Sequence, residues 1–294
     1  MNKKVLVLMG THNGIQWLEE QLNSILFQEG VEVSILASDD ASSDKTYEYL
    51  KSNSDVRLMP GRGPHGSAGA NFFYLLKHAD FSGHDFIALS DQDDIWSNKK
   101  LERALYCLAA HGCDGYSANV TAFWADGREV LVEKAQIQKE WDFLFQSAGP
   151  GCTYVMSALL AKKIQDVLRA NPQIAKEICF HDWFIYAWTR ANGFKWFIDD
   201  TSVMRYRQHD TNVFGVNSGM AVGKHRIEKI KSGWYRGQVV AIAKVCGIES
   251  HELVHKVLSK TCSGRLALAF NAHKFRRRYR DALVLALISM MGWF

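Results

Sequence analysis

Three acids follow a short apolar run near the end of the first hundred residues. Residues 86–89 have the composition of a buried strand, and Asp91, Asp93 and Asp94 come soon after it in "LSDQDDIW". Carboxylates this close together repel one another unless they are solvated, capped or bound to a cation. Asp91 and Asp93 could both offer oxygen to Mg²⁺ or Mn²⁺, which prefer such ligands. On these residues alone, a polar turn that caps the next helix is the alternative.

A calcium-binding loop does not fit the same stretch. Glu102 stands at the twelfth position counted from Asp91, as such a loop requires. However, Ile95 and Trp96 occupy the positions that need an oxygen ligand and a glycine. We therefore weigh only a capping turn against a site for Mg²⁺ or Mn²⁺.

The segments around these acids alternate between strand-like and helix-like patterns. Apolar runs at residues 5–9, 31–37, 56–59 and 86–89 are typical of buried strands, and helical spacing of apolar residues separates them. This alternation predicts a parallel sheet in a doubly wound α/β domain. A polar stretch follows each strand: "THNG", "SDDASSD", a glycine-rich loop and "SDQDD". Because ligands of such sheets bind at the carboxyl ends of the strands, the four stretches predict one crevice.

The pattern becomes less regular after residue 100. We expect helices at residues 99–109, near residues 158–169 and in "DWFIYAWTRANG", where Gly193 would end the helix. Strands are expected in "YSANVTAF", "FKWFI" and "SVMRYRQH", and the last eighty residues are mainly helical in pattern.

The composition is typical of a globular chain and argues against several functional classes. Of 294 residues, 47% are hydrophobic, and a net charge of +4 gives no reason to expect a nucleic-acid partner. No apolar run reaches the roughly 18–20 residues of a transmembrane helix. The apolar part of "MNKKVLVLMG" is too short for a signal peptide. The six cysteines form no CxxC pair and are expected to be mostly buried, reduced thiols, which favours the cytoplasm.

In order and spacing, "THNG", "SDDASSDKT", "LSDQDDIW", "HDW" and "YRQH" resemble the motifs of family 2 glycosyltransferases with the GT-A fold. The "DQDDIW" form is most similar to bacterial rhamnosyltransferases that build cell-surface polysaccharide. The resemblance implies a GT-A domain at residues 1–215, built on a Rossmann-like, doubly wound mixed sheet. It would have a nucleotide-sugar half at 1–100 and an acceptor half at 101–215. Residues 216–294 would form a helical C-terminal region.

The resemblance also implies a donor site and a metal site. Asp39 would read the nucleotide base, Asp93 would hold the metal, and Asp91 would contact the ribose or the metal. The donor-binding set is Thr11, Asn13, Asp39, Asn71, Asp91 and Gln92, and the metal set is Asp93, His209 and Asp91, for Mn²⁺ or Mg²⁺. Such a cation would stabilise the charge that develops on the leaving diphosphate. By residue type alone, Asp39 would be a turn residue and His209 a structural histidine.

Asp182 in "HDW" matches the position of the family's catalytic base, which removes the proton from the acceptor hydroxyl. With the metal and Asp182 on opposite sides of the donor sugar, the resemblance implies direct displacement with inversion. Trp183 and Gly151 would shape the acceptor side. Without the other motifs, Asp182 would be interpreted as an acid in the first turn of a helix, where the helix dipole favours it.

The C-terminal stretch "KFRRRYRDALVLALISMMGWF" joins five basic residues to an apolar segment that is too short to span a bilayer. We predict an interfacial helix that attaches the protein peripherally to the cytoplasmic face of the inner membrane, near a lipid-linked acceptor. A helix packed on the catalytic domain, or on a second copy in a homodimer, is the alternative.

These motifs together predict an inverting, metal-dependent glycosyltransferase. It would move L-rhamnose from dTDP-L-rhamnose onto a growing or lipid-linked surface polysaccharide. A UDP-hexose donor on the same fold is one alternative. A non-catalytic nucleotide-sugar-binding scaffold protein is another, although binding alone would not need a base such as Asp182 in addition to Asp93.

Overall fold

A mixed sheet forms the central layer of the protein, which a computed structural model describes at residues 2–209 and 228–294. Within these residues the sheet has nine strands in the order β3-β2-β1-β4-β8-β6-β9-β5, and β7 pairs with β6. The strands are β1 (Lys3–Thr11), β2 (Val31–Asp39), β3 (Val56–Leu58), β4 (Phe86–Ser90), β5 (Ile95–Trp96), β6 (Gly115–Phe123), β7 (Glu129–Val132), β8 (Val155–Ser157) and β9 (Trp196–Arg207). The first four are mutually parallel, and β8 is antiparallel to both of its neighbours. The predicted α/β fold with a mixed sheet is confirmed.

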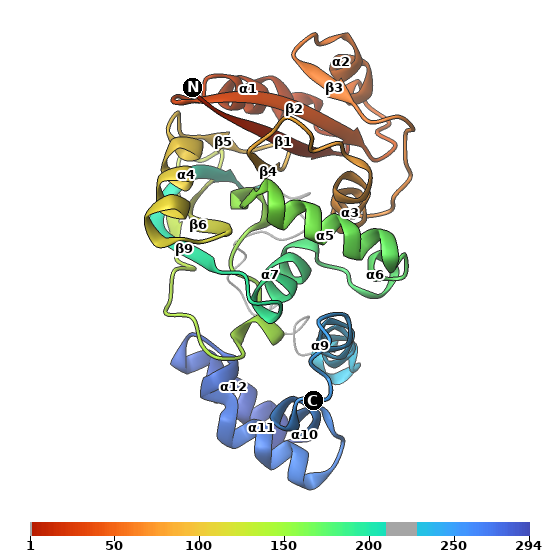
Figure 1. Cartoon of the computed structure of the whole chain (residues 1–294), viewed down its shortest axis with the longest axis vertical. Helices are drawn as coiled ribbons and strands as arrows, with labels where there is room; N and C mark the ends of the chain where they lie inside the picture. The colour runs from red at the N-terminus through yellow and green to blue at the C-terminus, as the bar shows by residue number, and fades with distance from the viewer. Residues whose placement is uncertain (1, 210–227) are drawn as a thin grey trace.

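Helices cover both faces of this sheet (Figure 1). One apolar core lies under α1 (Ile15–Leu26), α2 (Thr46–Ser52) and α4 (Lys100–His111). The other lies under α3 (Ala68–His78), α5 (Ala158–Ala170) and α7 (His181–Ala191). The remaining elements are η1 (Asp142–Leu144), η2 (Gly151–Thr153), α6 (Ile174–Glu177), α9 (Trp234–Val245), α10 (Glu252–Leu258), α11 (Cys262–Phe275) and α12 (Tyr279–Met290).

The continuous apolar runs form strands because the sheet is buried on both faces. In β1, Val5, Val7 and Met9 belong to one core, while Leu6 and Leu8 belong to the other, and all five are fully buried. Alternate side chains of a strand point to opposite faces, so a central strand needs apolar residues at every position.

The register of the parallel strands gathers the polar stretches at one edge. Thr11 at the end of β1 pairs with Asp39 at the end of β2, and Met9 pairs with Ser90 at the end of β4. The residues that follow these three strands therefore start from neighbouring positions, as a single crevice requires.

Two sequence predictions about local structure need correction. The segments "FKWFI" and "SVMRYRQH" belong to one strand, β9, which follows β6 through register shifts rather than breaking into two strands. The cysteines are all free, but Cys179 and Cys262 are exposed, so fewer cysteines are buried than their apolar sequence neighbours suggested. Gly193 does end α7 as predicted: its φ is +80°, and the Phe194 N–H donates to the Thr189 carbonyl oxygen at 3.1 Å.

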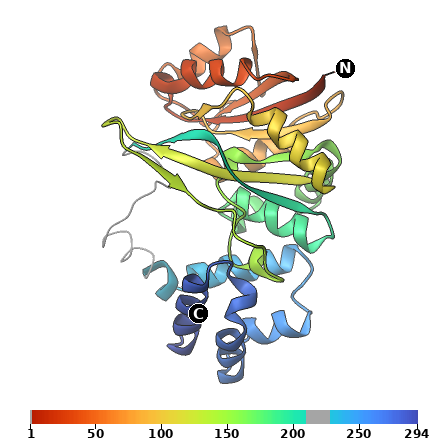
Figure 2. The ribbon, with the colours of Figure 1, turned by 90° about the vertical axis from the view of Figure 1, so that its left-hand side faces the viewer.

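The C-terminal helices extend the core on the α7 side of the sheet. Val239 of α9, Phe275 of α11 and Leu285 of α12 belong to the same buried apolar cluster as Phe184 of α7. Figure 2 shows these helices as a layer beneath the α/β part. No helix in the described residues is long and apolar enough to cross a membrane. The expected boundary at residues 215 and 216 lies outside the described residues.

Candidate active site

The nucleotide side of the crevice is organised around Asp39, which is 2% exposed. Its carboxylate accepts hydrogen bonds from the Thr11 hydroxyl at 3.1 Å and from the Ser42 hydroxyl and N–H at 2.5 and 3.0 Å. The Arg62 guanidinium lies 3.4 Å away. Thr11 and Asp39, both predicted to bind the donor, are therefore in direct contact, and several hydrogen bonds fix the Asp39 carboxylate.

The "THNG" and "SDDASSD" stretches are tied together by Asn13. Its backbone has a φ of +50°, a left-handed conformation that asparagine tolerates. The side-chain oxygen accepts from the Ser43 N–H at 2.8 Å, and the Asn13 N–H donates to the Ser42 hydroxyl at 2.8 Å. Gln92 fixes the same loop, because its amide exchanges two hydrogen bonds with the backbone of His12, at 2.7 and 2.8 Å. Asn13 and Gln92 thus shape the loop at the crevice.

Asn71 supports the crevice from the α3 side. Its amide nitrogen donates to the Ser38 carbonyl oxygen at 2.9 Å, immediately before Asp39. Its amide oxygen is buried and has no hydrogen-bond partner among the described residues. Asn71, which was predicted to bind the donor, therefore holds the end of β2, and its amide oxygen can still accept a hydrogen bond.

The predicted metal residues Asp93 and His209 meet across the sheet edge. His209 Nε2 lies 2.7 Å from Asp93 Oδ2, and the imidazole stacks on the Trp17 ring with centroids 4.0 Å apart. Arg207, two residues before His209, donates from its backbone to Asp94 Oδ1 at 3.1 Å and from Nε to the Asp93 carbonyl oxygen at 2.8 Å. Arg207 therefore fixes the acidic turn against the end of β9.

The other two acids of the turn lie in a region of low dielectric and negative charge. Burial, with the charges of Asp93 and Asp182, raises the pKa of Asp91 to about 7. Burial and the charges of Asp93 and Asp91 also raise the pKa of Asp94 well above its usual value. Burial lowers the pKa of Lys100, which lies near Asp94, to about 7. A bound cation would stabilise the ionised form of these neighbouring carboxylates.

Two sets of residues at or near this turn are candidates to hold a divalent cation. Asp91 and Asp93 offer carboxylate oxygens, and His209 offers an imidazole nitrogen, a set that suits Mn²⁺ or Mg²⁺. Asp91 and Asp94 also lie with the Cys152 thiol so that one ligand atom from each falls within 4.8 Å of the others. The second group is more deeply buried and includes a protonated thiol, because burial raises the pKa of Cys152. By ligand chemistry the first set suits a hard cation better, and the structure brings its members Asp93 and His209 into contact, whereas only the second set has all its ligand atoms gathered in the described residues.

Asp182, the predicted base, lies in the first turn of α7. Its Oδ1 accepts the Trp183 N–H at 2.8 Å. Burial raises the pKa of Asp182 to about 6, although the Trp183 N–H and the Ser147 hydroxyl lower it. A carboxylate with this pKa is ionised at neutral pH and still basic enough to accept a proton from a hydroxyl as it reacts.

The two predicted acceptor residues lie at different depths. A Cβ on Gly151 would lie 2.6 Å from His181 Nε2 and 3.3 Å from Asp182 Cβ, so η2 approaches the start of α7 closely. Trp183 is 5% exposed and donates from its indole to the Phe143 carbonyl oxygen at 2.8 Å. Its place in the core, stacked on Tyr235, leaves little surface for an acceptor.

Sequence reasoning missed Arg207, Ser147 and Lys100. Arg207 lies within the "YRQH" motif, so its position was a usable signal. Ser147 and Lys100 carry no motif, and only the fold brings them to Asp182 and Asp94.

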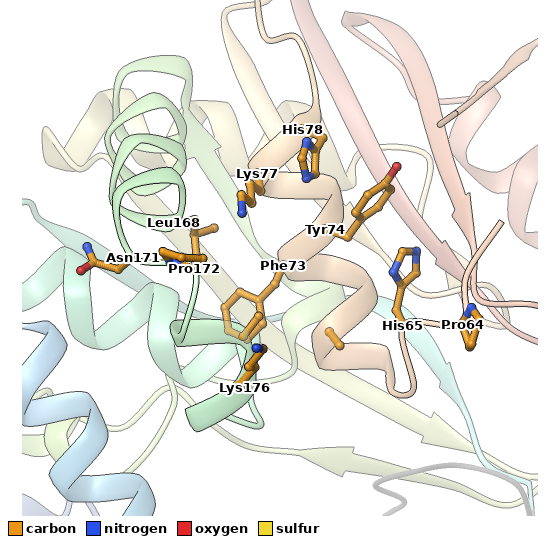
Figure 3. A pocket seen from close by; sticks show the side chains of 12 residues that line it. Pro64, His65, Phe73, Tyr74, Lys77, His78, Leu168, Asn171, Pro172 and Lys176 are labelled. Atoms are coloured by element: carbon orange, nitrogen blue, oxygen red, sulfur yellow. The ribbon is translucent and has the colours of Figure 1, made fainter. Parts of the chain in front are cut away.

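A hollow of about 340 Å³ lies between α3 and the segment that runs from the end of α5 into α6 (Figure 3). Phe73, Tyr74 and Lys77 line it from α3, with His65 on one side and Lys176 of α6 on the other. None of its lining residues belongs to the predicted donor, metal or base sets, so we assign it no substrate.

Comparison with known proteins settles the family. The sequence model of "Glycosyl transferase family 2" matches residues 6–167. The chain belongs to glycosyl transferase family 2. The dTDP-rhamnosyl transferase RfbG of Shigella flexneri is 38% identical over 97% of this chain and 100% of its own length. The UDP-Glc:alpha-D-GlcNAc-diphosphoundecaprenol beta-1,3-glucosyltransferase WfgD of Escherichia coli is 25% identical over 76% of this chain and 78% of its own length.

Solved glycosyltransferases share the fold. TarS 1–349 of S. aureus in complex with UDP has a TM-score of 0.57 and 15% identity, and the match covers 98% of this chain and 92% of that one. The mannosyltransferase PcManGT of Pyrobaculum calidifontis, in complex with GDP-Man and Mn²⁺, has a TM-score of 0.52 and 15% identity, covering 100% and 81%. The predicted GT-A fold is thereby confirmed, and the protein is a glycosyltransferase with a rhamnosyltransferase among its relatives.

Proposed function

We propose that this glycosyltransferase moves L-rhamnose from dTDP-L-rhamnose onto a lipid-linked or growing surface polysaccharide, with inversion at the anomeric carbon. The observation that carries the donor assignment is the end-to-end similarity to a dTDP-rhamnosyl transferase. The contact of Asp93 with His209, and the interaction of the Asp91 charge with those of Asp93 and Asp182, support a catalytic role over a binding scaffold.

The residues divide the chemistry between them. Asp39, with Thr11 beside it, would hold the nucleotide, and Asp91, Asp93 and His209 would hold Mn²⁺ or Mg²⁺. Such a cation supplies Lewis-acid stabilisation of the charge on the leaving diphosphate. Asp182 would accept the proton of the acceptor hydroxyl as that oxygen attacks the anomeric carbon. Attack from the face opposite the leaving group inverts the configuration.

A screen of nucleotide sugars tests the donor. We expect dTDP to raise the melting temperature in the presence of Mn²⁺ and to raise it much less after EDTA treatment, because Asp93 would hold the cation that offsets the charge of the diphosphate. We expect dTDP-L-rhamnose, incubated with the enzyme, to be consumed faster than any UDP-hexose. Preference for UDP-glucose would favour the donor named for the E. coli relative. Indifference to every nucleotide would contradict the proposal.

We also propose that the protein works at the cytoplasmic face of the inner membrane, attached through an apolar face of α11 and α12. This apolar face comprises the exposed side chains of Leu266, Phe270, Tyr279, Leu283, Val284, Leu287, Met290 and Met291. Arg280, beside it, is 81% exposed and could meet anionic headgroups. Six free cysteines agree with a reducing compartment.

Charges placed on the apolar face test this attachment. The double variant Leu283→Asp/Leu287→Asp should reduce sedimentation with vesicles containing phosphatidylglycerol by roughly tenfold or more, since each leucine would lose apolar burial in the lipid. Leu159→Asp, at an exposed leucine of α5, is the matched control and should sediment as the wild type does. Unchanged vesicle binding of the double variant would exclude this face. Conversion of a dimer to a monomer, measured by light scattering, would show that a second copy occupies it.

A further inference from the structure

A polar hollow of about 410 Å³ lies where the C-terminal helices meet the segment that follows β7. Lys134 and Arg278 line it, together with Leu131, Val132 and Glu133. Figure 2 shows the chain after β7 running from the sheet down to these helices. None of the lining residues belongs to the predicted donor, metal or base sets. Two cations beside one hollow indicate that its ligand is an anion.

Backbone contacts fix the place of both cations. The N–H groups of Lys134 and Ala135 donate to Asn119 Oδ1 of β6, at 2.6 and 3.1 Å. Arg278 lies between α11 and α12, and its Nη2 donates to the Glu133 carbonyl oxygen at 2.7 Å. One wall of the hollow is therefore held to the sheet, and the other belongs to the C-terminal helices.

Glu133 is the acid among the five lining residues. Its Oε2 lies 3.9 Å from Arg278 Nη2, and its side chain is 67% exposed. An exposed ion pair at this distance contributes little to stability. The carboxylate can therefore turn toward solvent when a ligand anion takes its place beside Arg278, although its charge would still repel that anion.

The Lys134 side of the hollow leads toward the predicted base. A Cβ on Gly149 would lie 3.5 Å from Lys134 Cβ, and a Cβ on Gly151 would lie 3.3 Å from Asp182 Cβ. Residues 149–151 therefore connect the surroundings of Lys134 with those of Asp182. The charges agree with this proximity, because burial raises the pKa of Asp182 and the charge of Lys134 acts in the opposite direction.

The Arg278 side leads to the apolar face of α11 and α12. Arg278 immediately precedes α12, and the next residue, Tyr279, is 76% exposed and belongs to that apolar face. The apolar face, the two cations and the predicted base thus follow one another across the protein. A molecule with an apolar chain, an anionic linkage and a sugar hydroxyl presents its groups in the same order.

We propose that Lys134 and Arg278 bind the diphosphate that joins lipid to sugar in a lipid-linked acceptor. The inference rests on the proposed function and names the part of the acceptor that the protein recognises. The apolar chain would lie against α12, and the sugar would extend past Gly149 and Gly151 to Asp182. Two neighbouring cations match the charge of a diphosphate better than the single charge of a phospholipid headgroup.

Binding of farnesyl diphosphate, measured by calorimetry in the presence of EDTA, tests this site apart from catalysis. EDTA removes any metal ion that could hold the diphosphate at Asp93. We expect Lys134→Gln and Arg278→Gln each to raise the Kd roughly tenfold, the effect of losing one charge-assisted contact. Glu133→Gln should lower the Kd roughly two- to fivefold, because it removes a like charge beside the anion.

Arg128→Gln is the matched control, because Arg128 is an exposed arginine just before β7 with Asp126 4.0 Å away, and it does not line the hollow. It should bind farnesyl diphosphate as the wild type does. Wild-type affinity in the double variant Lys134→Gln/Arg278→Gln would overturn the proposal. Equal affinity of the wild type for dihexanoyl phosphatidylglycerol would also overturn it, since the site would then recognise a headgroup.

If Arg278→Gln does not fold, an unchanged Kd in Lys134→Gln overturns the proposal alone, because the backbone of Lys134 keeps its contact with Asn119. The transfer assays test the proposed function separately. Binding of farnesyl diphosphate needs neither the donor nor the base, so a wild-type protein that binds it but transfers no sugar would contradict the proposed function rather than this site.

Discussion

Replacing Asp182 by asparagine is expected to reduce sugar transfer roughly 10²- to 10⁴-fold, the usual contribution of a general base. Asparagine keeps an oxygen that can accept the Trp183 N–H but cannot take a proton from the acceptor hydroxyl. Binding of dTDP should remain close to wild type, because the nucleotide side is built on Asp39 and Thr11. Transfer rate and nucleotide affinity, measured on the same preparations, separate the two effects.

Stability provides a check on the same variant. The folded-state pKa of Asp182, about 6, lies above the ordinary value of 3.8, so ionisation at pH 7 costs folding free energy and the neutral amide avoids that cost. The melting temperature of Asp182→Asn at pH 7 should therefore equal or exceed that of the wild type. Asp166→Asn, which removes an exposed acid of α5, serves as the control and should retain transfer. Wild-type transfer by Asp182→Asn would refute the base.

The pH profile of the wild type follows from the same group. A base must be deprotonated, so kcat should fall as the pH drops below about 6, where Asp182 gains a proton.

The donor side of the site could be predicted because its residues stand at strand ends. Apolar runs identified β1 and β2, and parallel pairing then placed Thr11 beside Asp39 without any knowledge of side-chain contacts. The same reasoning placed the turn after β4 in that crevice. Local pattern and sheet geometry were sufficient to predict that these residues lie together, while their donor-binding roles were predicted from the family resemblance.

Contacts between distant segments could not be predicted in this way. The Gln92 amide binds the backbone of His12, and Arg277 binds Asp142 and the Ser147 carbonyl oxygen. Nothing in the type of a glutamine or an arginine indicates which backbone group it will meet. The basic tail was therefore predicted to meet lipid headgroups, although Arg277 within it is buried in the protein. Burial of Trp183 depends likewise on α9, far along the chain.

Replacing Asp93 by asparagine is expected to reduce transfer roughly 10²- to 10³-fold, because Lewis-acid stabilisation of the leaving diphosphate contributes several kcal/mol. The stabilisation of the fold by dTDP should also lose its dependence on Mn²⁺. Asparagine offers a neutral, weaker ligand, while the contact of this position with His209 can persist as a hydrogen bond. Thermal shifts with dTDP, with Mn²⁺ or with EDTA, measure the loss directly.

Asp94→Asn is the matched control, one residue away in the same turn. Asp94 Oδ1 already accepts the Arg207 N–H, a bond that the amide oxygen can keep, and the raised pKa of this buried acid means that little charge is lost. We therefore expect Asp94→Asn to retain a metal-dependent shift. The opposite pattern, with Asp94→Asn insensitive to Mn²⁺ and Asp93→Asn still responsive, would move the cation to the group formed by Asp91, Asp94 and Cys152. The two neighbouring acids thus distinguish the two candidate metal sites, because Asp93 belongs only to the group with His209 and Asp94 only to the group with Cys152. The acid whose removal abolishes the metal effect identifies the group that holds the cation.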